Sequence, residues 1–331
     1  MRYEDEQEPH YFRSMFEIGA ILTIGNVDYL LNTTARGGTA HPGDHLWDLR
    51  YDWPTFRRKL TGDLWRVDTN QFNTNYVSHP LAGTLYYTAA RSNHLSILES
   101  FGYAALGALM WEYFGELREE VSINDAIVTP TAGLALGETM MQLGGFFSRG
   151  RNNFANSVLA AVLSPARVLN DGADGNHPLR SLETDGLGFP TDIWHRFRLF
   201  AGAGTTIQRG AATGARTYYT DATFGLDMEV VNLPGYGGAA KRETTFSDGN
   251  MAELMFEGAI SNGELADASL VARFMPAGYY WRDADADRAT GLHGDGAVVG
   301  LLSSFEYGVH DFDRDRARPR DLYEILSPIG A

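Results

Sequence analysis

The chain has 331 residues, 44% of them hydrophobic, so it can bury a large core and can hold two domains or one large one. Its formal net charge is −15, and Lys and Arg form no basic patch, which argues against nucleic acid and anionic lipid headgroups as main partners. The sequence contains no cysteine, which excludes disulfides, thiolate catalysis and cysteine-ligated zinc or iron–sulfur sites.

Neither a secretory signal nor a membrane-spanning helix is expected from the apolar segments. The opening "MRYEDEQEPHYFRSMFEIG" has no basic region followed by an apolar run. The most apolar helical window, "FGYAALGALMWEYFGEL", is interrupted by Glu112 and is too short to cross a bilayer. We interpret residues 1–62 as a partly helical N-terminal extension.

Capping signals place the first two helices of a domain predicted over residues 63–175. Ser78 and His79 precede Pro80, and proline is well suited to the first turn of a helix, so one helix is expected from about residue 80 to 91. Ser96 and Glu99 have the spacing of a capping box, which predicts a second helix from residue 96 to about 120.

Proline also marks the next two helices. Thr129 precedes Pro130, which predicts that a third helix starts there and runs through "PTAGLALGETMMQLGGFF". The following segment, "NNFANSVLAAVLSPARVLN", reads as a fourth helix that Pro165 breaks or kinks.

After about residue 190 the hydrophobic pattern changes to a period of two. In "TFGLDMEVV", for example, Leu226 and Met228 share one face, while Asp227 and Glu229 share the other. Residues 190–331 are therefore predicted to form an antiparallel up-and-down β region joined by polar stretches such as "DADADRATG". Its five expected strands cover residues 196–208, 223–231, 251–260, 268–281 and 297–309.

Alternation alone does not decide which face of these strands meets water. Strand lengths near ten residues, and aromatic residues at Tyr218, Tyr219 and residues 279–281, match a tilted membrane strand with aromatic ends. We therefore predict an α+β protein in which a helical domain precedes all or part of an outer-membrane-type β-barrel. The alternative is a soluble antiparallel sheet with one solvated face.

The helical region resembles the DUF3943 family of uncharacterised bacterial proteins, which are found mainly in Gram-negative envelopes. The resemblance covers about residues 63–170 and rests on "DTNQFNTNYVSHPLAGTLYYTAARSN" and "LMWEYFGELREEVSINDAIVTPTAGLALGE". It implies a location in the bacterial outer membrane or periplasm and names no activity. The matching positions are Asp68, Asn75, His79, Pro80, Gly83, Tyr86, Tyr87, Arg91, Trp111, Glu112, Glu116, Ser122, Asp125, Thr129, Pro130, Gly133, Gly137 and Glu138.

Polar residues within the predicted helices form a candidate site. His79 and Arg91 lie on one stripe of the first helix, which also carries Gly83 and Tyr87, and Glu112 and Glu116 form a stripe on the second. A buried carboxylate needs a partner, and Arg91 is the nearest cation in sequence terms. We therefore expect Arg91, Glu112 and Glu138 to meet between three helices, with His79 at the edge.

Two interpretations of this cluster stay open. In the first, it is a buried ion-pair and hydrogen-bond network that fixes helix register, with Asn75 and Ser122 as caps. In the second, His79 acts with Glu112, Glu116 or Glu138 as a general acid/base pair or as ligands of a hard metal ion, although no tight metal-binding spacing supports this. The sequence specifies no cofactor.

Two functions of the protein correspond to these two interpretations of the cluster. The first is a structural or transport-related envelope protein whose helices pack on or plug a β-barrel. The alternative is an envelope-lipid hydrolase or acyltransferase that uses the His and carboxylate cluster. In both, the expected partner is a membrane lipid or another envelope component.

Overall fold

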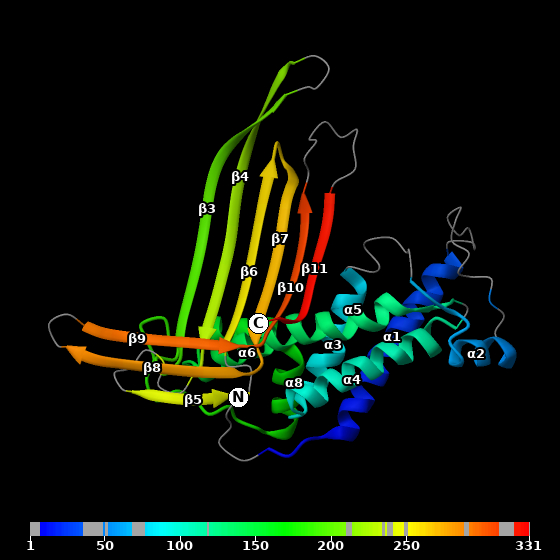
Figure 1. Ribbon diagram of the computed structural model, residues 1–331, viewed down its shortest axis with the longest axis horizontal. Coiled ribbons are helices and arrows are strands. Elements are labelled where there is room, and N and C mark those ends of the chain that lie inside the picture. The colour runs from blue at the N-terminus through cyan, green and yellow to red at the C-terminus, as the bar shows by residue number, and fades with distance from the viewer. Residues whose placement is uncertain are drawn as a thin grey trace. The chain divides into compact units, whose positions relative to one another are not determined.

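The computed structural model of the chain describes residues 7–35, 49, 52–67, 77–117, 119–209, 214–233, 236, 241–247, 251–287, 291–310 and 321–330. These fall into two compact units, shown in Figure 1. The helical unit comprises residues 2–141 and 164–177, and the β unit comprises residues 142–163 and 178–331. Each unit is described by itself.

Six α-helices and two π-helical segments build the described part of the helical unit. The helices are α1 (Tyr11–Ala35), α2 (Trp53–Leu60), α3 (His79–Ser92), α4 (Ile97–Met110), α5 (Ile123–Ala132) and α8 (Pro165–Asp174). The π-helical segments are η3 (Trp111–Gly115) and η4 (Gly133–Gly137), and strands β1 (Trp65–Arg66) and β2 (Val121–Ser122) form a short parallel pair. None of the described helices is both long enough and apolar enough to span a membrane.

The predicted starts of the first two helices are confirmed. Pro80 lies in the first turn of α3. The Ser96 side chain accepts a hydrogen bond from the Glu99 backbone N–H, and the Glu99 carboxylate accepts one from the Ser96 N–H, which completes the capping box of α4. The helical run that follows Ser96 ends at Gly115, with its last turn in π geometry, and not near residue 120.

The predicted start of the third helix at Pro130 is wrong. The helix begins at Ile123, where the Ser122 side chain caps it by accepting from the Asp125 N–H, and Pro130 lies in its interior. Helical structure continues through η4 into α6 (Glu138–Arg149). Proline in a helix removes one backbone hydrogen bond and clashes with the preceding turn, and here the π turn of η4 follows three residues later.

The break predicted at Pro165 is confirmed. Helix α7 (Phe154–Leu163), which belongs to the β unit, ends before Ser164, and α8 begins at Pro165. Ser164 has a non-helical backbone conformation, with φ −139° and ψ 64°, as expected for a residue that precedes proline. The two halves of the predicted fourth helix thus belong to different units.

The β unit contains two antiparallel sheets in the described residues. The larger has the strand order β11-β10-β7-β6-β4-β3 and the smaller the order β5-β8-β9. The strands are β3 (Trp194–Arg209), β4 (Arg216–Val231), β5 (Arg242–Phe246), β6 (Met251–Ser261), β7 (Glu264–Met275), β8 (Gly278–Asp287), β9 (Gly291–Gly300), β10 (Leu302–His310) and β11 (Asp321–Gly330).

Two segments predicted as single strands each divide between the two sheets. Residues 268–281 become β7 and β8, which are separated at Pro276, a residue that cannot donate to a strand ladder. Residues 297–309 become β9 and β10, separated at Leu301, whose N–H bonds to the Ala277 carbonyl at 2.9 Å. The stretch "DADADRATG", predicted to be a connection, begins within β8.

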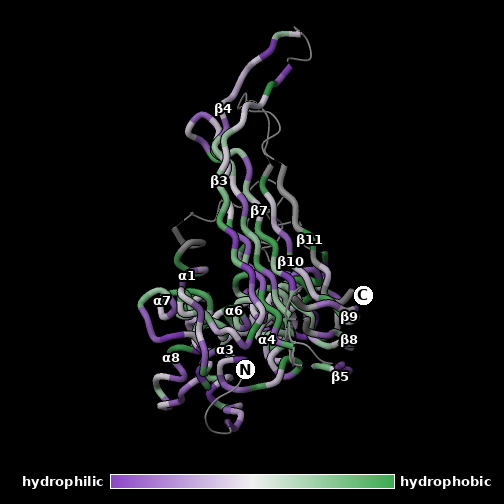
Figure 2. The backbone as a smooth tube through the Cα atoms, turned by 90° about the vertical axis from the view of Figure 1, so that its left-hand side faces the viewer, coloured by the Kyte–Doolittle hydropathy of each residue, from purple (hydrophilic) through white to green (hydrophobic). Residues whose placement is uncertain are grey.

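The larger sheet has one apolar and one charged face, and Figure 2 shows the alternating hydropathy along its strands. Leu199, Leu226, Phe256 and Leu270 are consecutive cross-strand neighbours in one row. The opposite face carries cross-strand ion pairs, which join Arg196 to Glu229 at 2.7 Å, Arg273 to Glu253 at 3.4 Å, and Arg198 to Asp227.

Aromatic side chains cover one end of the apolar face. Phe146 and Phe147 of α6 pack with Phe189 and with Phe197 of β3, at ring-centroid distances of 5.2–5.9 Å. Beyond this cluster the apolar face is open, since Leu199 is 84% exposed and Phe256 37%.

The α+β prediction is confirmed by the helices and the antiparallel sheets. In the described residues the larger sheet is open, with β3 and β11 at its edges.

Candidate functional site

The polar cluster of the helical unit is built on a close crossing of α3 with α5 and η4. A Cβ added at Gly83 would lie 1.8 Å from the carbonyl oxygen of Thr129, and one added at Gly133 would lie 2.4 Å from the carbonyl oxygen of Gly83. Glycine is needed at both positions because the two backbones touch. This crossing brings the N-terminal end of α3 against α5.

His79, at the start of α3, faces two residues of α5. Its Nε2 lies 3.6 Å from Oδ2 of Asp125, and its Nδ1 lies 3.4 Å from Oγ1 of Thr129. All three residues are buried. The Asp125 carboxylate is held from its other side, since Oδ1 accepts a hydrogen bond from the Asn124 side chain at 3.3 Å.

Glu112 completes this group from η3. One ligand atom each of His79, Glu112 and Asp125 lie within 4.8 Å of one another. Oε2 of Glu112 accepts a 2.7 Å hydrogen bond from the Ser122 backbone N–H. Burial raises the pKa of Glu112 to about 8, assisted by the nearby negative charge of Asp125 and opposed by the Ser122 hydrogen bond.

Further charged residues surround Glu112. Burial, and then the charge of Glu112, raise the pKa of Glu116 well above its usual value, while the Trp111 indole N–H donates to its carboxylate at 2.9 Å. The Glu119 carboxylate accepts from the Tyr29 hydroxyl. Lys59 is buried, and its ammonium donates to the backbone carbonyls of Glu112 and Glu116 at 3.1 and 2.7 Å. Burial lowers the pKa of Lys59.

Arg91 and Glu138 form a second polar centre at the other end of α3. The Arg91 Nε donates to Oε2 of Glu138 at 2.9 Å, and the Tyr87 hydroxyl donates to the same oxygen at 2.7 Å. Arg91 also donates to the carbonyl of Leu95 at 2.8 Å. Glu138 is fully buried. Burial and the Glu138 charge raise the pKa of Tyr87, so the phenol stays neutral.

The five residues singled out from the sequence thus lie in two groups. His79, Glu112 and Glu116 are at one end of α3, and Arg91 and Glu138 are at the other. The twelve residue steps from His79 to Arg91 correspond to about 18 Å of helix. Asp68 and Asn75 lie outside the described residues.

Sequence reasoning did not assign Asp125 or Lys59 to the site. Asp125 has a local signal, because Ser122 and Asp125 show the spacing of a helix start. That spacing places Asp125 in a first helical turn but does not predict that the turn faces His79. Nothing in the pattern around Lys59 points to the carbonyls of η3, since that contact depends on how α2 packs.

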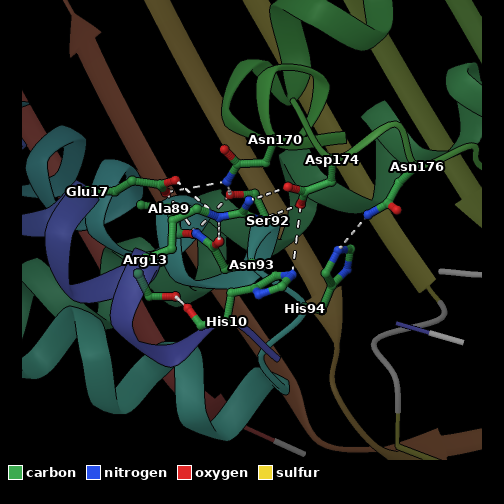
Figure 3. A network of polar contacts seen from close by, with 11 residues as sticks. His10, Arg13, Glu17, Ala89, Ser92, Asn93, His94, Asn170, Asp174 and Asn176 are labelled. Atoms are coloured by element: carbon green, nitrogen blue, oxygen red, sulfur yellow. Dashed lines mark hydrogen bonds and ion pairs between the residues drawn. The ribbon is translucent and has the colours of Figure 1, made fainter. Parts of the chain in front are cut away.

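A third polar network joins α1, α3 and α8, as Figure 3 shows. Arg13 binds Asp174 through two hydrogen bonds of 2.6 and 2.7 Å and also donates to the Asn93 side chain. Asn170 donates to Ser92 Oγ at 2.9 Å. His94, which has a φ of 66°, lies 3.3 Å from the amide nitrogen of Asn176. Burial, with the positive charges of His10 and Arg13, lowers its pKa to about 4.

The β unit contains a separate cavity of about 410 Å³ between its strands. Trp194, Tyr236 and Tyr280 form an aromatic wall, with ring centroids of neighbouring members about 6 Å apart, and Arg282 contributes the guanidinium. The residues predicted as an aromatic girdle at 279–281 begin β8, and Tyr280 is buried among Val231, Leu233 and Phe246.

Residues 64–166 match the family model described as "Domain of unknown function (DUF3943)". This confirms the resemblance predicted from the sequence, over about a third of the chain. No curated protein and no solved structure matches the chain. The match extends from β1 through α7 to the start of α8, and so contains His79, Glu112, Asp125, Arg91 and Glu138.

The chemistry of the two ends of α3 differs. Arg91, Glu138 and Tyr87 form a compact ion pair with its hydrogen bonds satisfied, which suits a structural role. The His79 end gathers four buried carboxylates, Glu112, Glu116, Glu119 and Asp125, around one buried ammonium and one imidazole. Such a group must take up protons or a cation to be stable in the interior.

Proposed function

We propose that the protein is a bacterial envelope protein whose larger sheet is embedded in the outer membrane with its apolar face toward lipid. The observation that carries this proposal is the exposed row of apolar side chains across consecutive strands. Leu199, Phe224, Phe256 and Ile260 are 36–84% exposed. Monomeric soluble proteins rarely leave a contiguous apolar face of this kind open to water.

The opposite face supports the same proposal. Its Arg–Glu and Arg–Asp pairs suit the polar, water-filled interior of an outer-membrane-type barrel. Strand lengths agree, because β6 and β7 have 11 and 12 residues and a tilted membrane strand needs about 9–11. The apolar face is less open toward the end that the aromatic cluster covers. Met228 is buried, while Leu226 and Leu254 are partly exposed.

Membrane embedding requires that the edge strands of the sheet be paired. Unpaired backbone groups are not tolerated in hydrocarbon, so strands β3 and β11 need partner strands there. The proposal therefore includes closure of the sheet into all or part of a barrel, by these edges or by further strands. The role of the helices, to pack on or plug such a barrel, remains a prediction.

Single-cysteine labelling tests this proposal on neighbouring residues of β6. Because the chain contains no cysteine, Phe256→Cys and Glu257→Cys each provide one labelling site, on opposite faces of the same strand. An environment-sensitive dye at position 256 should show blue-shifted emission in vesicles and be quenched by brominated lipid chains. The dye at position 257 should show neither effect.

Fractionation of the native, full-length protein provides the complementary measurement. Recovery in the outer-membrane fraction, with a heat-dependent shift in gel mobility, is expected. If the native protein is soluble and the dyes at positions 256 and 257 are equally hydrated, the proposal is wrong and the sheet is a soluble one.

A lipid-directed hydrolase or acyltransferase is the second candidate, favoured by the buried contact of His79 with Asp125 next to Glu112. In this function Nδ1 of His79 would take a proton from the water or alcohol that attacks the ester carbonyl and return it to the alcohol that leaves, while Asp125, next to Nε2, orients the imidazole. The test is release of fatty acid from phospholipid vesicles by the full-length protein. His79→Gln should abolish the release and retain the fold, and Arg91→Lys should leave the release in place.

A further inference from the structure

The three residues His79, Glu112 and Asp125 come from three separate helical elements, α3, η3 and α5, and all are at least 93% buried. Their convergence therefore depends on the fold and cannot arise from local sequence. Two carboxylates and one imidazole would carry a charge of −2 with the imidazole neutral. This charge matches that of a divalent cation.

The separations of these groups fit a metal ion. Two ligand atoms about 2.1 Å from a tetrahedral metal lie roughly 3.4 Å apart. Nε2 of His79 and Oδ2 of Asp125 are 3.6 Å apart, and Glu112 brings a ligand atom within 4.8 Å of both.

Each of the three side chains also contacts a neighbouring residue outside the group of three. Thr129 contacts Nδ1 of His79, the Asn124 amide donates to Oδ1 of Asp125, and the Ser122 N–H donates to Oε2 of Glu112. Residues that ligate metals characteristically have such outer partners, which fix the imidazole tautomer and orient the carboxylates. A hydrogen bond from Nδ1–H to Thr129 would direct the Nε2 lone pair toward Asp125.

We propose that His79, Glu112 and Asp125 form a binding site for one divalent transition-metal ion. The imidazole and the two carboxylates favour zinc, manganese, iron(II) or cobalt over magnesium and calcium, which prefer sites made of oxygen ligands alone. This site is independent of membrane embedding, because its ligands all belong to the helical unit.

Metal binding to the full-length protein tests the site directly. After chelator treatment and dialysis, the protein is titrated separately with Zn²⁺, Mn²⁺, Co²⁺ and Mg²⁺, and bound metal, thermal midpoint and the Co²⁺ visible spectrum are recorded. We expect about one Zn²⁺ or Co²⁺ per chain, a raised thermal midpoint and a Co²⁺ spectrum with nitrogen and oxygen ligands. Mg²⁺ should bind at least tenfold more weakly.

Conservative variants identify the ligands. Asp125→Asn and Glu112→Gln keep the side-chain size and should each lower the affinity at least tenfold, and His79→Gln should remove the nitrogen contribution to the Co²⁺ spectrum. Thr129→Val, which removes only the outer partner of His79, should weaken binding about 10–100-fold. Glu119→Gln is the matched control, because it neutralises a buried carboxylate outside the triad, and should retain binding.

Circular dichroism spectra of all variants separate loss of binding from loss of fold. If a ligand variant does not fold, the Co²⁺ spectrum of the wild type and the Thr129→Val affinity still decide the question. The proposal is overturned if the wild type binds none of the four ions, or if Glu119→Gln weakens binding as much as the folded ligand variants do.

Discussion

His94 is a half-buried histidine in the network between α1, α3 and α8, and it makes the stability of that network dependent on pH. Its pKa falls from 6.5 to about 4 in the folded protein because burial and the charges of His10, Arg13 and Arg91 oppose its protonation, against the attraction of Asp174. Between those two values the unfolded chain binds more protons than the folded one. Stability therefore increases with pH across this window and is lost as pH falls from about 6.5 to about 4.

Replacing His94 should reduce this acid sensitivity. Asn is the suitable substitute, since it tolerates the positive φ of 66° at this position. We expect the free energy of unfolding of His94→Asn to fall less than that of the wild type between pH 7 and pH 5, as measured by urea denaturation at both values. Equal pH dependence of the two proteins would contradict the assignment.

Arg91 compensates the fully buried carboxylate of Glu138. Arg91→Ala leaves that charge without its guanidinium and should lower stability by roughly 3–5 kcal/mol, as broken buried pairs do. Arg91→Lys should recover only part of the loss, because an ammonium cannot reproduce the two contacts to Glu138 and the bond to the Leu95 carbonyl. Thermal unfolding of both variants provides the measurement. A melting temperature of Arg91→Ala within a degree of the wild type would exclude this role.

At the scale of residues, the sequence identified most members of both centres but not their grouping. Period and burial argued that Glu112 and Glu138 would need partners, and each has them. Arg91 is separated from Glu112 because Arg91 lies at one end of α3 and Glu112 lies beside His79 at the other. This arrangement depends on helix packing. Asp125 was missed for the same reason, since only the crossing at Gly83 brings α5 against His79.

The elements themselves depend on a few local signals, of which the α4 capping box is the clearest. Ser96→Ala removes the side-chain acceptor for the Glu99 N–H and should cost about 1 kcal/mol. Ser78→Ala is the control, because the Ser78 side chain makes no capping hydrogen bond in α3, and it should cost less. Chemical denaturation of the two variants compares them directly. A cost at Ser78 equal to that at Ser96 would count against the cap.

The contact between α3 and α5 requires glycine at position 83. Gly83→Ala would place Cβ 1.8 Å from the Thr129 carbonyl oxygen, so the helices must separate. We expect destabilisation of at least about 1–3 kcal/mol. Gly102→Ala in α4 meets nothing within 4 Å and should stabilise the protein by up to about 1 kcal/mol through helix propensity. Opposite signs of the two changes in melting temperature are the expected result.

Sequence signals located the element starts at Pro80, Ser96 and Pro165, where one residue type has a strong local preference. They failed at Pro130, because the general rule that proline begins a helix is outweighed there by the Ser122 cap and by the packing of α5 on α3. Alternation identified most of the strands but not the change of sheet near Pro276 and Leu301. The alternation with a period of two continues through each change of sheet, so the pattern does not reveal it. Pro276, which cannot donate to a strand ladder, is the one local signal.

At the scale of the whole chain, the helical unit is closed by a long-range contact. The chain leaves this unit at residue 142 and returns at residue 164 to form α8. The two hydrogen bonds between Arg13 and Asp174 join α1 to α8 across 161 residues of sequence. Asn170 adds a bond from α8 to Ser92 of α3.

Arg13→Ala should therefore loosen α8 more than the rest of the unit. We expect a loss of about 1 kcal/mol, since the pair is partly exposed but doubly hydrogen-bonded, and faster amide hydrogen exchange in residues 165–174. Arg66→Ala breaks the more exposed 3.6 Å pair with Glu120 and should change stability by less. Unchanged exchange in α8 would show that other contacts hold it.

The π geometry of η3 has a consequence for how the chain tolerates changes of length. In η3 the Glu116 N–H bonds to the carbonyl of Trp111, five residues earlier, so this turn holds one residue more than a regular helical turn. Deleting Phe114 would remove this extra residue and let the turn relax to α geometry, so the direction of the residues after it would change little. The same deletion within α4, whose turns hold no extra residue, would turn everything after it by about 100° and carry Glu112 and Glu116 out of their present contacts.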